Sequence, residues 1–397
     1  MQGKIVLGLG NNIDYEIRWD SAILETLIRK YEIKDEELSS KIEIANERDL
    51  VISILSFLRD ETGGERFVHD PRIIEDFSQY FSRRITLGGT SVRAAIAMDK
   101  IGFDSWAHLV TINPHVRNLL PESCRYICSA DDEQLYPHLI IQYHDGTIVN
   151  ANDIYIRTGR ANRIIYVNDL DNMLMRLSPQ LGDLISEASV FLVSGFNGMQ
   201  DEALLESRLN ELNLAMEKLP LDAQVFYEDG CFHLSGFSEL VRRKLLRRIH
   251  IYSLNEDEFQ GYIGRKIALL DPEAVLTGLV DLRRRIPVPV LVVHTRYWAL
   301  AYGDNASRYQ NALKGGIAMA GTRFRLGDDF SMLDYRETMG APLQETGRQF
   351  SEKINALEAD NVCSLACIQA EENNATTIGL GDAFVGGFIP QLVSQAK

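Results

Sequence analysis

The residues best suited to chemistry lie near the C-terminal end of the chain, in the segment Gly379-Leu380-Gly381-Asp382. This segment stands between an apolar stretch over residues 362–368, which predicts a strand, and a helical pattern over residues 383–395. Glycine lets backbone amides approach an anion, and a helix N-terminus adds the positive end of its dipole. A carboxylate there can take a proton from a hydroxyl while the amides hold a phosphoryl group. Aspartate is also a common helix cap, so a structural role fits this segment as well.

Carboxylates and amides follow three other apolar runs of the chain. Asn12 and Asp14 come just after the first run, Glu228 closes a later one, and Asn255 and Glu258 follow a third. In open parallel sheets, ligands bind beyond the carboxyl ends of the strands. We therefore expect these side chains to converge in space with Asp382.

The elements that position these residues form a regular pattern in the second half of the chain. Helical segments alternate there with short apolar runs, an order that predicts a parallel sheet with helices on both faces. The predicted strands cover residues 190–193, 224–227, 249–253, 288–293 and 362–367.

The first half of the chain mixes helices with a smaller amount of strand. Gly88-Gly89 precedes a helical pattern that extends to Lys100, and Thr90 or Ser91 is expected to cap that helix. Residues 139–143 and 147–149 flank Asp145-Gly146, a sequence typical of a β-hairpin. Residues 163–167 are expected to join the same small sheet.

Taken together, these motifs resemble the ADP-dependent glucokinase/phosphofructokinase family, a branch of the ribokinase superfamily. The resemblance implies an α/β fold with a ribokinase-like, doubly wound, mostly parallel sheet, helices on both faces, and a smaller α+β lid domain. The large domain would comprise residues 1–12, 86–133 and 172–397, and the lid residues 13–85 and 134–171. The motifs that carry the resemblance are Asn12-Ile13-Asp14, Gly88-Gly89, Asn255-x-x-Glu258, His294-Thr295-Arg296-Tyr297 and Gly379-Leu380-Gly381-Asp382.

The resemblance also implies a role for each of these residues in a sugar kinase that uses ADP. Asp382 would be the catalytic base, and Gly379, Leu380 and Gly381 would form the anion hole. The metal set for Mg²⁺ would be Glu228, Asn255 and Glu258; the sugar-binding set would be Asn12, Asp14, Gly88, Gly89 and Arg163; the nucleotide-binding set would be His294, Thr295 and Tyr297.

Several alternatives stay open at this point. Asn255 and Glu258 have the spacing of a helix capping box, which needs no metal. The family pattern at Glu228 is His-x-Glu, whereas this chain has Phe226, which puts the histidine's contribution in doubt. The basic stretch over residues 157–163 resembles the one that handles sugar phosphate in the phosphofructokinase members of the family. It favours a phosphorylated hexose as the acceptor, and arginine matches phosphate geometry. A free hexose such as glucose is the alternative acceptor. An ATP-dependent ribokinase-like sugar or nucleoside kinase, or a catalytically silent sugar- or nucleotide-binding homologue, is the alternative function.

Composition limits the partners that this chain can have. Its 397 residues carry a net charge of −15, which argues against nucleic acid or an anionic membrane as the main partner. No apolar run approaches the length of a membrane span, and the first residues do not resemble a signal peptide, so a cytoplasmic location is expected. The expected partners are a small-molecule sugar and a nucleotide. The cysteines, expected to be reduced and buried, are Cys124, Cys128, Cys231, Cys363 and Cys367.

Overall fold

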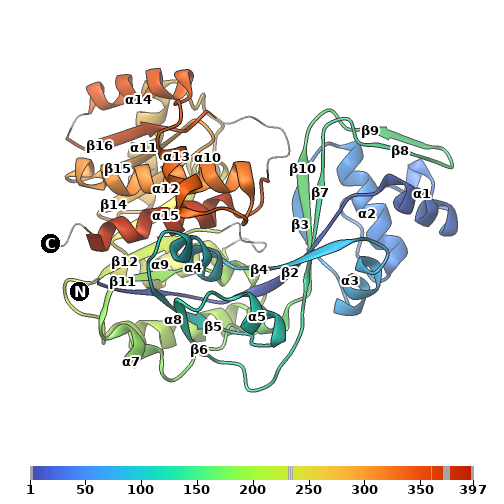
Figure 1. Cartoon of the computed structure of the whole chain (residues 1–397), viewed down its shortest axis with the longest axis horizontal. Helices are drawn as coiled ribbons and strands as arrows, with labels where there is room; N and C mark the ends of the chain where they lie inside the picture. The colour runs from blue at the N-terminus through green and yellow to red at the C-terminus, as the bar shows by residue number, and fades with distance from the viewer. Residues whose placement is uncertain are drawn as a thin grey trace.

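The computed structural model describes residues 3–230, 232, 234, 236–358, 360–369 and 376–394. Two β-sheets dominate this part of the chain, a large one with helices on both faces and a small one beside it (Figure 1). The N-terminal strand β1 lies inside the large sheet, third from its β6 edge, and the chain then crosses directly to the small sheet.

Within the described residues, the large sheet has nine strands in the order β16-β15-β14-β13-β12-β11-β1-β5-β6. All neighbouring strands from β14 to β6 pair in parallel, whereas β15 is antiparallel to both β14 and β16. The predicted mostly parallel sheet is therefore confirmed. Its strands are β1 (Lys4–Leu7), β5 (Ser105–Leu109), β6 (Cys124–Cys128), β11 (Ala188–Val193), β12 (Gln224–Glu228), β13 (Ile251–Asn255), β14 (Val290–His294), β15 (Trp298–Gly303) and β16 (Val362–Ala366).

Helices cover both faces of this sheet because side chains alternate along each strand. In β1, for example, Leu7 belongs to one buried apolar cluster and Val6 to the other. The first cluster is completed by α4 (Thr90–Lys100), α5 (Pro114–Leu119), α12 (Gln310–Leu326), α13 (Met332–Met339) and α15 (Leu380–Ser394). The second is completed by α7 (Leu181–Ile185), α8 (Glu202–Met216), α9 (Phe237–Leu245), α10 (Glu256–Ile263), α11 (Pro272–Arg285) and α14 (Glu345–Leu357).

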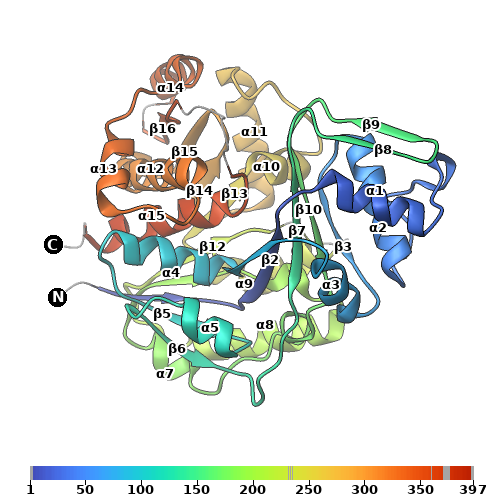
Figure 2. The ribbon, with the colours of Figure 1, turned by 45° about the vertical axis from the view of Figure 1, so that its right-hand side comes forward.

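The small sheet has the order β3-β10-β7-β2-β4. Its strands are β2 (Asn12–Ile17), β3 (Gly64–Phe67), β4 (Arg83–Gly88), β7 (His138–Tyr143) and β10 (Asn162–Val167). Figure 2 shows α1 (Ser21–Lys30), α2 (Glu47–Arg59) and α3 (Pro71–Ser78) on the side of this sheet away from the large sheet. A third buried cluster joins these helices to the sheet. The short α6 (Leu170–Leu174) leads the chain back to the large sheet, and the 3-10 turns are η1 (Asp35–Glu37), η2 (Phe196–Gly198), η3 (Leu246–Arg248) and η4 (Ala306–Tyr309).

Of the two details predicted for the small sheet, one is confirmed and the other is wrong. The strand expected over residues 163–167 does join it, as β10 antiparallel to β7. The hairpin expected around Asp145-Gly146 is wrong, because β8 (Ile148–Ala151) pairs with β9 (Ile154–Arg157) and not with β7. Both edges of β7 are occupied by β10 and β2, so no edge is left for β8.

Three further features concern the helices and the cysteines of the described residues. None of the helices in the described ranges is long and apolar enough to cross a membrane. Cys124, Cys128, Cys363 and Cys367 are free thiols, as expected. Cys124 and Cys363 are also buried, whereas Cys128 and Cys367 are partly exposed, and Cys231 lies outside the described residues. The helix expected over residues 383–395 is α15, which begins earlier, at Leu380, and residue 395 also lies outside the described part.

Candidate active site

A cavity of about 1020 Å³ lies between the large sheet and the small sheet. Its walls come from the carboxyl ends of β1, β11, β12, β13 and β14, from the first residues of α4 and α15, and from one face of the small sheet. Along β10, Arg163 and Ile165 line the cavity, whereas Ile164 and Tyr166 point into the third cluster. The volume is ample for a sugar and a nucleotide together.

Most of the predicted site residues line this one cavity. Two do not: Gly88 and Glu258 lie outside its lining. The predicted residues that line it are Asn12, Asp14, Gly89, Arg163, Glu228, Asn255, His294, Thr295, Tyr297, Gly379, Leu380, Gly381 and Asp382.

Asp382 lies in the first turn of α15 and faces helix α4. The helix begins at Leu380, and the amide of Ala383 donates to the carbonyl of Gly379 at 3.0 Å. The carboxylate of Asp382 accepts a hydrogen bond from Oγ1 of Thr90 at 2.8 Å. The first amides of a helix have no partner within it, so those of Leu380 and Gly381 are free of helical hydrogen bonds. A residue that only caps α15 needs no partner on α4, so a capping role does not account for the hydrogen bond between Thr90 and Asp382.

Two arginines hold the loop that precedes Asp382. Nη1 of Arg163 donates to the carbonyl of Thr377 at 3.0 Å, and Nε of Arg323 donates to the carbonyl of Ile378 at 2.8 Å. Arg323 also pairs with Asp328, and burial lowers the pKa of Arg323 to about 10. A peptide N–H points opposite to its carbonyl, so the amide that follows Ile378 points away from Arg323. That amide belongs to Gly379, the first residue of the predicted anion hole.

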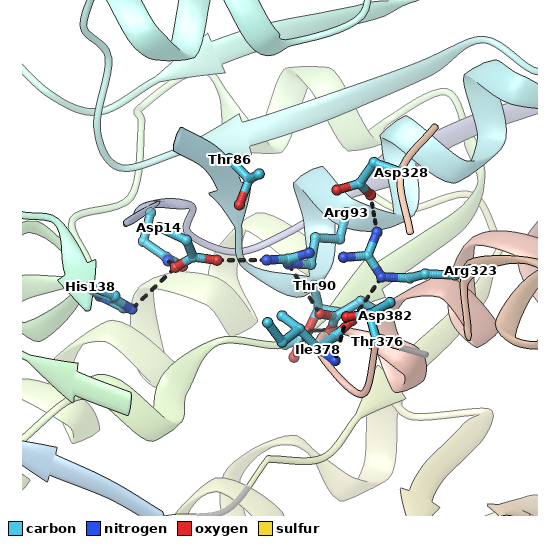
Figure 3. Close-up of polar contacts among 12 residues, drawn as sticks. Asp14, Thr86, Thr90, Arg93, His138, Arg323, Asp328, Thr376, Ile378 and Asp382 are labelled. Carbon is cyan, nitrogen blue, oxygen red and sulfur yellow. Dashed lines mark hydrogen bonds and ion pairs between the residues drawn. The ribbon is translucent and has the colours of Figure 1, made fainter. Parts of the chain in front are cut away.

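Asp14 lies on β2 and is surrounded by donors. Its Oδ1 accepts from Nδ2 of Asn12 at 2.6 Å, and its Oδ2 accepts from Nη2 of Arg93 at 2.6 Å (Figure 3). His138 Nδ1 lies 3.9 Å from Oδ1, and burial raises the pKa of the Asp14 carboxyl against the lowering effect of Arg93 and His138.

His138 is itself held by a second carboxylate. Its Nε2 lies 3.1 Å from Oδ2 of Asp169, which also accepts from Asn172 at 2.6 Å. Burial acts to lower the pKa of His138, but the hydrogen bond and charge of Asp169, together with the charge of Asp14, raise that pKa above its ordinary value. These carboxylates therefore favour the protonated form of His138 at the cavity wall beside Asp14.

The glycine pair before α4 lets the chain pass close behind Asn12 and Asp14. A Cβ on Gly88 would lie 2.3 Å from Nδ2 of Asn12 and 2.6 Å from Oδ2 of Asp14. Gly89 has φ of +90°, and a Cβ there would lie 3.0 Å from Cα of Asn11. Gly88 thus supports the polar pair from behind, which explains why it does not line the cavity.

The other end of the cavity is acidic. Nε2 of His294 lies 3.1 Å from Oε1 of Glu228, and its ring lies 4.8 Å from that of Phe384. The second oxygen of Glu228, Oε2, is buried and has no hydrogen-bond partner in the described structure. Gly381 lies next to this pair, since a Cβ on it would meet His294 at 3.4 Å and Glu228 at 3.7 Å.

Asn255 and Glu258 form the capping box that their spacing allows. The side chain of Asn255 accepts from the amide of Glu258 at 3.0 Å, and Oε2 of Glu258 accepts from the amide of Asn255 at 2.8 Å. Burial, and then the charge of Asp229, raise the pKa of Glu258 to about 8. The carboxyl group of Glu258 therefore caps α10 and lies partly buried near other acidic groups.

Thr295 and Tyr297 lie in the turn between β14 and β15. Oγ1 of Thr295 accepts from the amides of Tyr297 and Trp298 at 3.1 and 3.0 Å, so this hydroxyl closes the turn. Tyr297 lines the cavity beside Arg296, whose guanidinium lies 4.6 Å from the ring centroid of Tyr297.

Sequence reasoning missed four side chains of this site. Thr90 was expected to cap α4, but the cap position is Gly89 and Thr90 contacts Asp382. Arg93 had a signal, because it is a lone charge in the apolar part of that helix. His138, on the cavity wall, and Arg323, against the loop before Asp382, had none, since only long-range packing brings each of them to its place.

Comparisons with known proteins bear on the family and on the fold. The model of the ADP-specific phosphofructokinase/glucokinase conserved region matches residues 3–388. A hypothetical ADP-dependent phosphofructokinase from Pyrococcus horikoshii OT3 has a similar structure, with a TM-score of 0.80, 16% identity, and coverage of 99% of this chain and 98% of that one. A phosphofructokinase from the same organism, solved with AMP, has a TM-score of 0.77 and 17% identity, with coverage of 99% and 98%.

A third solved structure, an ADP-dependent kinase in complex with fructose-6-phosphate and ADPβS, has a TM-score of 0.75 and 15% identity. The matched region covers 99% of this chain and 94% of the chain of that kinase. No curated protein matches the chain. The match of the family model over nearly the whole sequence decides the assignment, and the chain belongs to the ADP-specific phosphofructokinase/glucokinase family.

Proposed function

We propose that this chain is a Mg²⁺-dependent kinase that transfers a phosphoryl group from ADP to a hydroxyl of a hexose or a hexose phosphate. One observation carries the proposal. The carboxylate of Asp382 stands at the start of α15, beside the Gly379–Gly381 backbone, in the same cavity as the carboxylate of Asp14. One carboxylate can thus bind the acceptor while the other takes its proton.

In the proposed reaction Asp382 accepts the proton of the sugar hydroxyl as its oxygen attacks the β-phosphorus of ADP. The bond from that phosphorus to the bridging oxygen breaks, and AMP leaves. Amides of Gly379, Leu380 and Gly381 stabilise the charge on the transferring group, as fixed donors do without reorganisation. The products are AMP and the phosphorylated sugar.

The acceptor would lie against the small sheet. Asp14 and Asn12 offer oxygen and nitrogen atoms for sugar hydroxyls, with Gly88 and Gly89 behind them. Arg163 is exposed at the cavity wall and can bind a phosphate on the sugar. The relative bound to fructose-6-phosphate supports the phosphorylated hexose as the first acceptor to test.

The nucleotide would lie along the carboxyl ends of β12, β13 and β14. His294 and Tyr297 have side chains in the cavity, whereas the hydroxyl of Thr295 is committed to its turn. Thr295 therefore contributes by shaping the turn that carries the other two. The relative solved with AMP supports a nucleotide as the ligand of this end.

The acidic end fits a magnesium ion that is bound mainly through the nucleotide. No group of three histidine, cysteine, aspartate or glutamate side chains in the described ranges could hold a metal alone. Mg²⁺ usually keeps several waters and uses one or two carboxylates plus phosphates. The unpartnered Oε2 of Glu228 fits such a ligand. Asn255, which lines the cavity, would hold waters of the ion, and Glu258, outside the lining, would act from behind Asn255. When bound, the ion would neutralise phosphate charge.

A coupled assay that compares ADP with ATP as donor, and fructose 6-phosphate with glucose as acceptor, tests the proposal. We expect turnover with ADP and Mg²⁺ and none with ATP. Turnover with ATP alone would identify an ATP-dependent sugar kinase instead. Thermal stabilisation by ADP and sugar without turnover would identify a silent binding homologue.

We also propose the cytoplasmic location that is expected from the sequence.

A further inference from the structure

Arg93 is a buried arginine between the two carboxylates on which the proposed reaction depends. Its Nη2 donates to Oδ2 of Asp14 at 2.6 Å, and its Nε lies 3.8 Å from Oδ2 of Asp382 (Figure 3). Its side chain is only 5% exposed. Asp14 belongs to the small sheet and Asp382 to a helix on the large sheet, so one guanidinium bridges the two walls of the cavity.

The same helix supplies a second contact to Asp382. Thr90 lies three residues before Arg93 and so shares its face of α4. Its hydroxyl donates to Oδ1 of Asp382 at 2.8 Å, while Arg93 faces Oδ2. Both oxygens of Asp382 are therefore oriented by side chains of α4.

Helix α4 is itself tightly fixed. The hydroxyl of Ser91 donates to the carbonyl of Gly10 at 2.6 Å, which ties the start of the helix to the segment after β1. Gly379 passes directly over Arg93, since a Cβ on Gly379 would lie 2.8 Å from Cδ of Arg93. Arg93 thus also underlies the glycine backbone predicted to hold the transferring phosphoryl group.

The surroundings of Arg93 do not suit a phosphate-binding role. Three carboxylates face its guanidinium: Asp14, Asp382 and, at 3.6 Å, Glu16. A stability role is a weak explanation as well, because buried ion pairs often contribute no more than well-packed apolar side chains of the same volume. What distinguishes Arg93 is that it contacts both functional carboxylates at once.

We propose that Arg93 is a positioning residue, which sets the distance and orientation between the carboxylate that binds the acceptor and the carboxylate that takes its proton. This inference rests on the proposed function. A sugar held by Asp14 would then present a hydroxyl to Asp382 at a separation fixed by one rigid, planar guanidinium. Misplacement of reacting groups by about 1 Å costs on the order of 100-fold in rate.

The test compares kcat and the acceptor KM in Arg93→Met, Arg93→Lys and Thr90→Val, with fructose 6-phosphate and glucose as acceptors. Thr90 contacts Asp382 but not Asp14, so Thr90→Val should lower kcat and leave the acceptor KM unchanged. Arg93→Met should lower kcat on the order of 100-fold and also raise the acceptor KM. The KM for ADP should stay unchanged in all of these variants. Lys100→Met, at the far end of the same helix, is the matched control and should behave as the wild type.

Arg93→Lys keeps the test decisive if Arg93→Met does not fold. Lysine retains the charge, but its single nitrogen cannot contact both carboxylates in the arginine geometry. We therefore expect Arg93→Lys to fold and still to lose at least tenfold in kcat, about 1.4 kcal/mol.

Three results would overturn the inference. The first is wild-type kcat and acceptor KM in Arg93→Lys. The second is an Arg93→Met enzyme whose kcat falls only in proportion to the fraction of protein that is unfolded, while the KM values for the acceptor and for ADP stay unchanged. The third is a wild-type enzyme that turns over no donor and acceptor pair, which would remove the proposed function as well. Wild-type turnover together with either of the first two results would remove only the role of Arg93.

Discussion

Replacing Glu258 by glutamine tests whether burial holds this carboxyl in its neutral form. Burial, and then the charges of Asp229 and Glu228, raise its pKa to about 8 from an ordinary value of 4.5. The folded state therefore binds the proton more tightly than the unfolded state. By linkage, the protonated carboxyl makes its full contribution to the free energy of unfolding below about pH 4.5. This contribution is lost as the pH rises through about 8.

The size of the effect follows from this difference in pKa. A tenfold change in proton affinity is about 1.4 kcal/mol, so a rise from 4.5 to about 8 sets an upper limit of about 5 kcal/mol. Water reaches this partly exposed side chain and weakens the effect, so we expect about 2 kcal/mol. Glutamine can still accept the hydrogen bond from the amide of Asn255, so the cap of α10 is kept. Glu258→Gln should thus be more stable than the wild type by about 2 kcal/mol near pH 8.5 and nearly equal to it near pH 5.

Urea unfolding in the presence of a chelator, at about pH 5 and about pH 8.5, measures this difference. Asp257→Asn is the matched control, because Asp257 is 82% exposed and its pair with Lys266 is solvent-screened. The same stability difference between Glu258→Gln and the wild type at both pH values would refute the reasoning. With Mg²⁺ and ADP added near pH 8.5, the wild type should gain more stability than Glu258→Gln. An equal gain would show that Glu258 only caps its helix.

Three further substitutions test the remaining parts of the site. Asp382→Asn should lower kcat on the order of 10²- to 10⁴-fold with little change in nucleotide affinity, and near-normal initial rates would remove Asp382 as the base. Asp14→Ala should raise the acceptor KM strongly for fructose 6-phosphate and glucose alike, since hydroxyl contacts are lost in both; an unchanged KM would contradict its sugar role. Arg163→Ala should cost a phosphorylated acceptor about 1.5–3 kcal/mol more in kcat/KM than a free hexose, as expected for a lost charge-assisted hydrogen bond. Equal losses for both sugars would favour a free-hexose kinase.

The large sheet and the convergence of its polar strand ends could be predicted from the sequence because both follow from local patterns. Apolar runs alternating with helices imply parallel strands, and the carboxyl ends of parallel strands meet at one edge. Asn12, Glu228, Asn255 and Asp382 were found in this way, and all of them line one cavity.

The small sheet was harder to predict because its pairing joins segments far apart in the sequence. The Asp145-Gly146 turn has the local signature of a hairpin, but the amide of Gly146 donates to the carbonyl of Thr158 and so extends the open end of the β8–β9 ribbon. Local turn chemistry could not reveal that β2 and β10 already occupy β7. The division of the chain into a large domain and a lid, with limits at residues 13–85 and 134–171, stays a prediction.

The charged groups of α4 were missed for a different reason. A buried arginine is favourable only when its carboxylate partners are present, and those of Arg93 come from β2 and from α15. Neither partner lies within 70 residues along the chain, so no spacing rule applies. A charge in an apolar helix indicates that it must have charged or polar partners, but the sequence does not show which residues these are.

The departure at Phe226 shows how the fold can supply a side chain that the local motif lacks. Phe226 is fully buried, and its ring lies 5.4 Å from that of Phe388, so an imidazole at this position would lose its water without gaining a polar partner there. Glu228 nevertheless has a histidine beside it, because His294 reaches it from β14, two strands away in the sheet. That contact leaves one oxygen of Glu228 unpartnered within the described structure, and this is the oxygen that a cation or a phosphate-bound water would need. The missing histidine of the local motif is therefore no argument against phosphoryl transfer by this chain.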